Sequence, residues 1–209
     1  MIKPLLISTL LALSPALAQA QEAKPTPLAQ MPAGAYTLDK THASLTWKVS
    51  HMGMSKYTAR FAALDAKLNF NPQDITKSTV RVTVDPASVT TDYPDAQKTD
   101  FDAELAKGTN WFNAGKFPEI TFESTKLEKT SETTGKLTGN LTFLGVTKPL
   151  TLDVTFNGGY EKMPMMNIPA MGFSATGTLK RSNWGLTSYV PMIGDDVELL
   201  IETEFHKAQ

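Results

Sequence analysis

The sequence lacks cysteine altogether, and its 20 Lys and Arg residues nearly balance its 21 Asp and Glu residues. Without cysteine the chain forms no disulfide and no thiolate metal site, so an extensive apolar core has to stabilise it. The balanced charge and the lack of a basic patch argue against a nucleic-acid partner. The three histidines, His42, His51 and His206, follow no metal-ligand or general-base spacing. No nucleophile set or phosphate-binding loop can be assembled, so we expect no catalytic site, no metal and no cofactor.

Long apolar runs are also scarce. One run, Leu5–Leu17, follows Lys3 and ends before the small-residue pattern Ala-Gln-Ala. This arrangement predicts a cleaved signal peptide over residues 1–20, and hence an exported protein. The run is shorter than the roughly 20 residues that span a bilayer, so we expect no stable membrane span. Residues 21–34, rich in Pro, Ala and Gln, predict a flexible linker before a single domain over residues 35–207.

What the sequence does contain is strict alternation of apolar and polar residues. Within residues 136–158, Leu141 and Phe143 share one parity, and the apolar residues of 150–156 share one parity after the segment Gly145–Pro149. A period of two places successive side chains on opposite faces of a strand. The segment therefore predicts a β-hairpin with one buried face, joined through Gly145–Pro149.

Similar runs recur along the chain, at residues 44–50, 57–70, 78–85, 119–127, 171–181 and 195–205. In one of them the apolar parity changes near Ala62 and Ala63, which predicts a bend or bulge. One helical stretch, about 95–107, carries Phe101 and Leu105 at i, i+4. We therefore predict an all-β fold, a single extended eight-stranded antiparallel barrel with one short helix. A β-sandwich is the alternative.

Six ordered segments carry a resemblance to a known family. They read YTLDKTHAS (36–44), VSH leading to RF (49–61), WFN through FPEITF (111–122), GNLTFLGVTKP (139–149), RSNWGL (181–186) and IGDDV (193–197). Together they resemble the YceI-like family of lipocalin-fold, polyisoprenoid-binding proteins of the bacterial periplasm. The resemblance implies a lipocalin-like barrel that holds a long-chain isoprenoid lipid, such as a quinone or a polyprenyl phosphate, without catalysis. Many members carry Arg-Asp-x-His-Leu in the helix where this chain has FDAEL, so no role of that histidine carries over.

Parity and the resemblance together predict the residues that line such a cavity. They are Trp47, Phe61, Phe101, Leu105, Trp111, Phe112, Phe122, Leu141, Phe143 and Phe173. Aromatic walls suit an elongated apolar ligand. The alternative for each residue is ordinary core packing, and the protein would then be a ligand-free structural or stress-response module. The sequence leaves open whether the chain forms a homodimer.

Methionines cluster at Met163, Met165 and Met166, with Met171 beyond. Thioethers are ligands for Cu(I), so a copper-handling protein is a second alternative. We favour a pliable loop over the mouth of the cavity, because methionine adapts to varied apolar ligands. The His-Met-x-Met pattern at residues 51–54 has the same two interpretations.

Overall fold

The computed structural model describes residues 25–208. The predicted signal peptide, residues 1–20, lies outside the described residues, as do residues 21–24 of the predicted linker. Within the part that is described, no helix combines the length and the apolar run that crossing a bilayer requires.

Strands make up most of this part of the chain. They are β1 (Gly34–Leu38), β2 (Ser44–His51), β3 (Ser55–Phe61), β4 (Leu64–Phe70), β5 (Thr79–Val84), β6 (Val89–Thr90), β7 (Ile120–Lys129), β8 (Thr134–Phe143), β9 (Val146–Tyr160), β10 (Ala170–Lys180) and β11 (Ile193–Lys207). The helix α1 spans Phe101–Lys107, and short 3-10 turns are η1 (Leu28–Gln30), η2 (Lys40–His42), η3 (Ile75–Lys77), η4 (Pro86–Ser88) and η5 (Arg181–Trp184).

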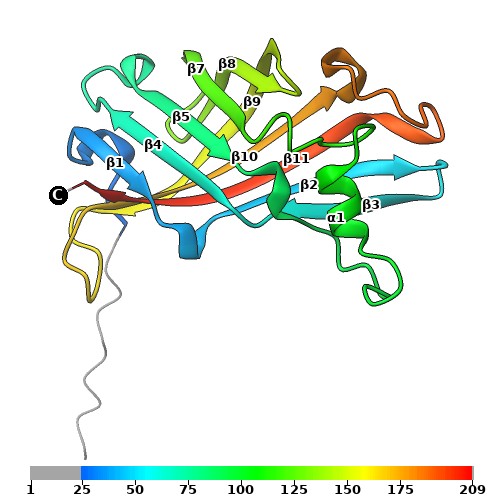
Figure 1. Cartoon of the computed structure of the whole chain (residues 1–209). Coiled ribbons are helices and arrows are strands. Elements are labelled where there is room, and N and C mark those ends of the chain that lie inside the picture. Colours follow the sequence, from blue (N-terminus) through cyan, green and yellow to red (C-terminus); the bar gives the residue numbers. More distant parts are fainter. Residues whose placement is uncertain (1–24, 209) are drawn as a thin grey trace, which may run out of the picture.

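Eight of these strands form a closed antiparallel ring (Figure 1). Their order is β1-β4-β5-β7-β8-β9-β10-β11, and the pairing of β1 with β11 closes it. The remaining strands extend the wall on one side, since β2 pairs with β11, β3 with β2 and β6 with β3. The predicted eight-stranded antiparallel barrel is confirmed.

Three breaks divide the long strands of the wall. The first two separate β1 from β2 at η2, and β3 from β4 at Ala62-Ala63, where the parity change predicts a bend. The third separates β5 from β6 at η4, which begins at Pro86, a residue that has no N–H to contribute to a ladder. After each break the chain continues along the same wall. The strands on one side of the breaks, β1, β4 and β5, pair with one another and form one end of the barrel. The strands on the other side, β2, β3 and β6, pair with one another and form the other end.

The hairpin of β8 and β9 turns more tightly than the sequence predicts. Only Leu144 and Gly145 lie between the two strands, with φ values of 49° and 75°. Two central residues with positive φ are typical of the type I′ turn, whose twist matches that of paired strands. The segment Val146–Pro149 therefore belongs to β9 and not to the connection. The predicted buried face is confirmed, because Leu141 and Phe143 are both 7% exposed.

The helix is shorter than the predicted stretch 95–107. Residues 94–98 form a turn, and α1 begins at Phe101 after Asp100, whose side chain accepts a hydrogen bond from the Ala103 N–H. An aspartate at this position satisfies a free N–H of the first helical turn, which fixes where the helix starts. The predicted end is correct, since the Gly108 N–H caps the helix on the Glu104 carbonyl.

Residues 25–34 do not behave as the flexible linker predicted over 21–34. The Thr26 N–H donates to the Gly159 carbonyl at 2.6 Å, and η1 packs against β9. Met31 is 1% exposed and lies against Gly159, so this segment is part of the barrel's core. The predicted flexibility is wrong because it was inferred from the Pro and Ala content of the segment. That content does not reveal that one side chain, Met31, is buried in the barrel and holds the segment in place.

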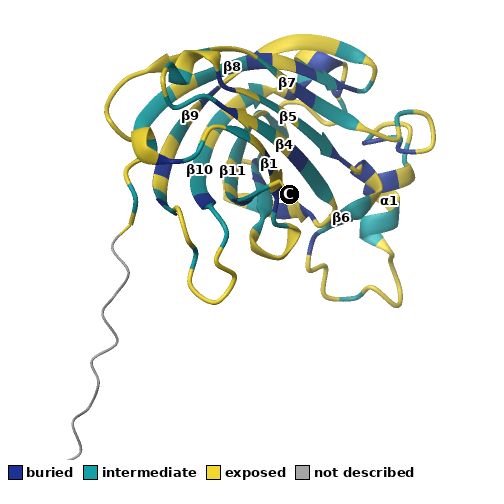
Figure 2. Cartoon of the chain, turned by 90° about the vertical axis from the view of Figure 1, so that its left-hand side faces the viewer, coloured by how far each residue is buried: buried dark blue, intermediate teal, exposed yellow. Residues whose placement is uncertain are grey.

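Apolar side chains inside the barrel form two clusters. The larger one lies at the end covered by α1 and includes Phe112 and Leu141. The second lies at the end where β1 meets β11 and includes Met31, Phe156 and Met171. Figure 2 shows the buried residues alternating with exposed ones along the strands, as expected for a wall with one face inside.

Candidate ligand-binding cavity

A cavity of about 540 Å³ lies within the larger cluster, inside the end of the barrel that α1 covers. This volume falls in the range of about 300–1,000 Å³ that is typical of small-molecule sites. Nine of the ten residues predicted to line a cavity do line it. They are Trp47, Phe61, Phe101, Leu105, Trp111, Phe112, Phe122, Leu141 and Phe143.

Phe173 is the exception, and its predicted place in the cavity wall is wrong. Its ring packs between Phe156 and Phe205, at centroid distances of 5.5 and 6.1 Å, in the second cluster. That end of the barrel is filled by side chains, including that of Met31, the residue after η1. Parity predicts correctly that Phe173 points inward, but it does not tell which end of the barrel is packed.

Aromatic side chains hold α1 over the cavity. Phe101 from α1 meets Tyr57 of β3 edge-on at 6.0 Å, and Phe112, just after the helix, meets Trp47 of β2 edge-on at 6.0 Å. Phe112 also lies 5.2 Å from Phe61. Edge-to-face pairs at these distances add stabilisation beyond burial. The helix is therefore a fixed wall of the cavity, built from side chains that also line it.

The sequence-based list omits several lining residues. Tyr57 shares the inward parity of Phe61 on β3, so alternation alone could have identified it. Tyr93 and Tyr189 also line the cavity. Both lie in loops, where the sequence has no apolar/polar alternation from which the direction of a side chain could be predicted. Tyr189 stacks on Trp111 at 5.7 Å, which attaches its loop to the segment after α1.

A buried arginine fixes the loop beside the cavity. Arg181 is 3% exposed, and its guanidinium donates hydrogen bonds to four backbone carbonyls, those of residues 186, 188, 193 and 194. Burial lowers the pKa of the Arg181 guanidinium, and the nearby Asp195 carboxylate opposes that change. Because these hydrogen bonds engage all three of its nitrogens, we assign Arg181 to holding the loop and not to binding a ligand.

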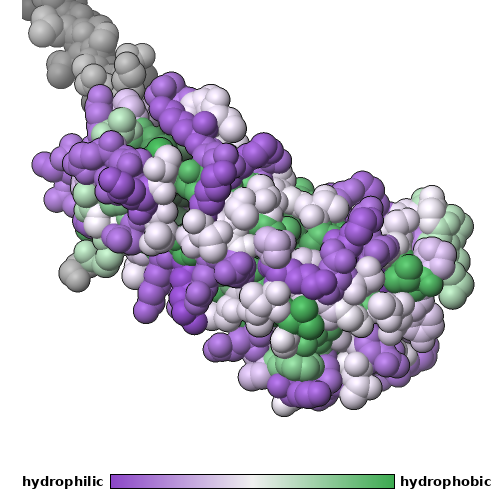
Figure 3. Space-filling model, turned by 90° about the horizontal axis from the view of Figure 1, so that it is seen from above, coloured by the Kyte–Doolittle hydropathy of each residue, from purple (hydrophilic) through white to green (hydrophobic). Residues whose placement is uncertain are grey.

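The cavity opens where its lining residues are exposed, at His51, Ser55, Tyr93 and Tyr189. Apolar side chains surround this opening, and Met52, Met54 and Met192 are more than half exposed there. Met52 lies in the turn between β2 and β3, and Met192 lies in the loop between η5 and β11. The Met52 N–H donates a hydrogen bond to the Met192 carbonyl at 2.7 Å, which joins this turn to this loop. Figure 3 shows apolar atoms gathered at the right-hand end of the molecule, where Figure 1 places the β2–β3 hairpin.

The methionine loop, which carries Met163, Met165 and Met166, does not cover the mouth of the cavity, contrary to prediction. It connects β9 to β10 at the opposite end of the barrel from α1 (Figure 1), and no residue of 160–170 lines the cavity. Met171 is 1% exposed inside the second core, whereas Met165 is fully exposed. Met171 therefore serves in packing and does not join the loop methionines.

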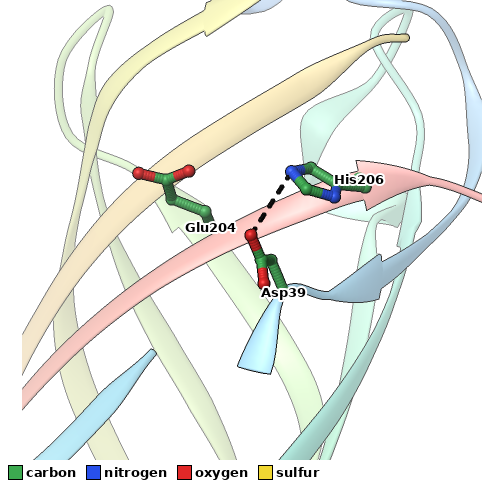
Figure 4. Close-up of side chains that lie close together, drawn as sticks. All are labelled: Asp39, Glu204 and His206. Atoms are coloured by element: carbon green, nitrogen blue, oxygen red, sulfur yellow. Dashed lines mark ion pairs between the residues drawn. The ribbon is translucent and has the colours of Figure 1, made fainter. Parts of the chain in front are cut away.

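A polar cluster lies at the end where β1 meets β11 (Figure 4). Ligand atoms of Asp39, Glu204 and His206 lie within 4.8 Å of one another. The Asp39 carboxylate is already engaged, because it accepts hydrogen bonds from the Thr41 N–H and pairs with His42 Nδ1 at 2.7 Å. His206 Nε2 lies 3.7 Å from Asp39 Oδ2, too far for a hydrogen bond. The contacts of Asp39 are those of a residue that caps η2.

Asp39→Asn is expected to lower the free energy of unfolding at neutral pH by about 1–2 kcal/mol. The hydrogen bond with His42, followed by those from Thr41, lowers the pKa of Asp39 to about 2. A lowered folded-state pKa stabilises the protein above the unfolded value and loses that contribution as pH falls through the folded value. Urea unfolding between about pH 5 and pH 2 should therefore show a shallower pH dependence in the variant.

Asp74→Asn provides the matched control. Asp74 caps η3 with the same hydrogen bond from the N–H two residues on, but it has no histidine partner and is more exposed. We expect a smaller loss of stability there. An equal loss at both positions would contradict the role of the Asp39–His42 pair.

Comparison with known proteins identifies the family. A family model described as a YceI-like domain matches residues 36–205. The chain belongs to the YceI-like family. A UPF0312 protein of Ectopseudomonas mendocina is 34% identical over 177 residues, which cover 84% of this chain and 88% of that protein. The resemblance predicted from the six sequence segments is thus confirmed.

Solved structures agree with the barrel. The Campylobacter jejuni YceI protein is 30% identical, with a TM-score of 0.67 over 77% of this chain and 90% of that one. A polyisoprenoid-binding domain from Saccharophagus degradans is 14% identical, with a TM-score of 0.56 over 84% of this chain and 99% of that one. The second likeness shows the fold alone.

Proposed function

We propose that this protein is a periplasmic carrier that holds the isoprenoid tail of an amphiphile in the cavity beneath α1. The observation that carries the proposal is the cavity itself, whose wall is built from aromatic and aliphatic side chains on β2, β3, β7, β8 and α1. The polyisoprenoid-binding description of the Saccharophagus degradans domain supports the ligand class. The apolar run and cleavage pattern of residues 1–20 support export to the periplasm.

The energetics of burial favour a long apolar tail. Each five-carbon isoprene unit removed from water contributes on the order of 3–4 kcal/mol, at about 0.8 kcal/mol per CH₂ group. A few units therefore exceed the cost of association, even when the cavity offers few polar contacts. Such a site selects its ligand mainly by the length and apolar character of the tail.

The cavity supports this function over that of a ligand-free structural module. A protein that acts only through packing gains from filling its interior, as the second cluster around Phe156 does. The space beside Leu141 and Phe143, by contrast, is open and reaches the surface at Tyr189.

Two measurements test the proposal. Native mass spectrometry of gently purified protein, followed by organic extraction, should reveal a bound species with an isoprenoid mass. Protein stripped of lipid should bind geranylgeraniol with a change in tryptophan fluorescence, because Trp47 and Trp111 line the cavity. Protein that purifies empty and does not bind geranylgeraniol would refute the proposal.

A further inference from the structure

Two histidines from opposite ends of the domain meet beside one carboxylate. His42 Nδ1 lies 2.7 Å from Asp39 Oδ2, and His206 Nε2 lies 3.7 Å from the same oxygen. Glu204 adds a second carboxylate, since its ligand atom and those of Asp39 and His206 all lie within 4.8 Å of one another (Figure 4). We call these four residues the histidine–carboxylate cluster. None of the four, all within the described chain, lines the cavity beneath α1.

The strand pairing that closes the barrel also assembles the cluster. Just after β1 ends, the Asp39 N–H donates to the Glu204 carbonyl of β11 at 2.8 Å. Phe205 is 5% exposed in the second core cluster, so its neighbours Glu204 and His206 lie together on the outer face of β11. The turn η2 follows and ends at His42, beside Asp39. The sequence predicts no metal site because His42 and His206 lie far apart along the chain.

The two oxygens of the Asp39 carboxylate have different partners. Oδ1 accepts hydrogen bonds from the Thr41 N–H at 2.9 Å and from the Thr41 hydroxyl at 2.6 Å. Asp74 caps η3 with the same two hydrogen bonds, from the N–H and the hydroxyl of Thr76. Capping therefore explains Oδ1 and its threonine. It does not explain why two histidines and a second carboxylate gather at Oδ2.

One atom of the cluster lacks the partner that its burial requires. His206 Nε2 exposes less than 1 Å² and has no hydrogen-bond partner among the described residues. Buried polar atoms are almost always hydrogen-bonded, and 3.7 Å to Asp39 Oδ2 is too long for such a bond. A cation between these two atoms binds both of them. It needs no water-sized opening at Nε2, and the side chain of His42, which is 60% exposed, leaves a route from solvent.

The donor atoms of the cluster suit Zn²⁺. Imidazole nitrogens and carboxylate oxygens bind this ion at about 2.0–2.2 Å in a tetrahedral arrangement, which places the ligand atoms roughly 3.4 Å apart. The 3.7 Å between His206 Nε2 and Asp39 Oδ2 is close to that separation. The half-buried Glu204 reaches the ion by rotating its side chain. With both imidazoles neutral, the two carboxylates balance the charge of the ion.

We propose that the histidine–carboxylate cluster binds one Zn²⁺ ion. The four ligand atoms are Asp39 Oδ2, His42 Nδ1, one carboxylate oxygen of Glu204 and His206 Nε2. The ion takes the place of the proton between Nδ1 and Oδ2, and this proton leaves to solvent. Four protein ligands leave no open position, as in structural zinc sites. The ion links η2 to β11 and stabilises the closed barrel, because the unfolded chain does not hold these ligands together.

Zinc titration of protein purified without a histidine tag and dialysed against EDTA tests the proposal. Competition with a coloured chelator should give one Zn²⁺ per chain. The Tm should rise by about 5–10 °C when free Zn²⁺ is in hundredfold excess over its Kd. His206→Gln and His42→Gln should each weaken zinc binding by at least about tenfold, since losing even a residue that only orients a ligand costs about that much. His51→Gln is the matched control, because it removes the histidine outside the cluster and should leave zinc affinity unchanged.

Co²⁺ provides a second measurement, which reports the geometry of the site in the wild-type protein. Tetrahedral Co²⁺ absorbs visible light strongly, whereas six-coordinate Co²⁺ absorbs weakly. The wild-type protein should give the strong spectrum, and excess Zn²⁺ should abolish it. His206→Gln should lose the strong spectrum, while its circular dichroism and its Tm in EDTA show that it folds. The wild-type spectrum tests the proposal even if a variant does not fold.

Three results would overturn the proposal. The first is a wild-type Tm that does not respond to Zn²⁺. The second is zinc binding that His51→Gln abolishes and His206→Gln does not, which would place the ion outside the cluster. The third is a six-coordinate Co²⁺ spectrum, which contradicts a site of four protein ligands. Because the cluster lies outside the cavity, none of these results bears on isoprenoid binding, which the geranylgeraniol titration measures.

Discussion

Replacing Arg181 with Met is expected to lower the free energy of unfolding by about 3–5 kcal/mol. The guanidinium donates to four carbonyls between residues 186 and 194, and these hydrogen bonds hold the loop between η5 and β11. Methionine fills a similar length of space and is apolar, so the cavity wall stays occupied while every donor is lost. Urea or guanidinium unfolding, with the slope of the transition compared between proteins, measures the difference.

Two control variants separate geometry from charge at this position. Arg181→Lys keeps the charge but replaces the planar fork with one compact ammonium, so it should recover only part of the loss. Arg81→Met removes an arginine of the exposed pair Arg81–Glu123, whose side chains are 61% and 55% exposed, and should cost less than about 1 kcal/mol. Equal losses at positions 81 and 181 would contradict the assigned role of the buried guanidinium.

The alternation of apolar and polar residues was enough to predict the barrel. In β8 the residues 139, 141 and 143 are buried, and in β9 the residues 150, 152 and 156, with less buried residues between them. The same period of two along the other runs indicates a wall with one inner face. The break at Ala62-Ala63 was also visible, because a change of parity within one run requires the backbone to bend. These features depend only on which face of a strand a residue occupies. The residues next to it in the sequence are enough to predict that face.

Features that depend on distant partners could not be predicted in this way. Phe143 and Phe173 both point inward, but one lines the cavity and the other packs on Phe156, because η1 and β1 fill only one end of the barrel. The partners of Arg181 are backbone carbonyls, which carry no residue-specific signal. The place of the methionine loop follows from which end of β9 it leaves, and a β-hairpin connection can lie at either end.

Leu141→Trp is expected to weaken geranylgeraniol binding by at least about tenfold while changing the free energy of unfolding by less than about 1 kcal/mol. Leu141 is 7% exposed and lines the cavity, so the larger indole ring enters space that the isoprenoid tail would occupy. Each isoprene unit that is displaced removes a favourable burial term from binding. The stability stays near that of the wild type because the ring displaces no packed side chain. Fluorescence titration and urea unfolding of the same preparation measure the two quantities.

Leu38→Trp is the matched control, because it makes the same substitution in a packed environment. Leu38 is also 7% exposed and also lies on a strand of the ring, but it belongs to the second cluster, opposite Phe205 in the pairing of β1 with β11. Inserting an indole there forces neighbouring side chains out of their places, which should cost about 1–3 kcal/mol or more, with little effect on geranylgeraniol affinity. Opposite responses at two leucines of equal burial would show that the end of the barrel under α1 is a binding site and the other end is a core. A destabilising Leu141→Trp with unchanged affinity would instead mean that both ends are packed, and that the tail binds elsewhere.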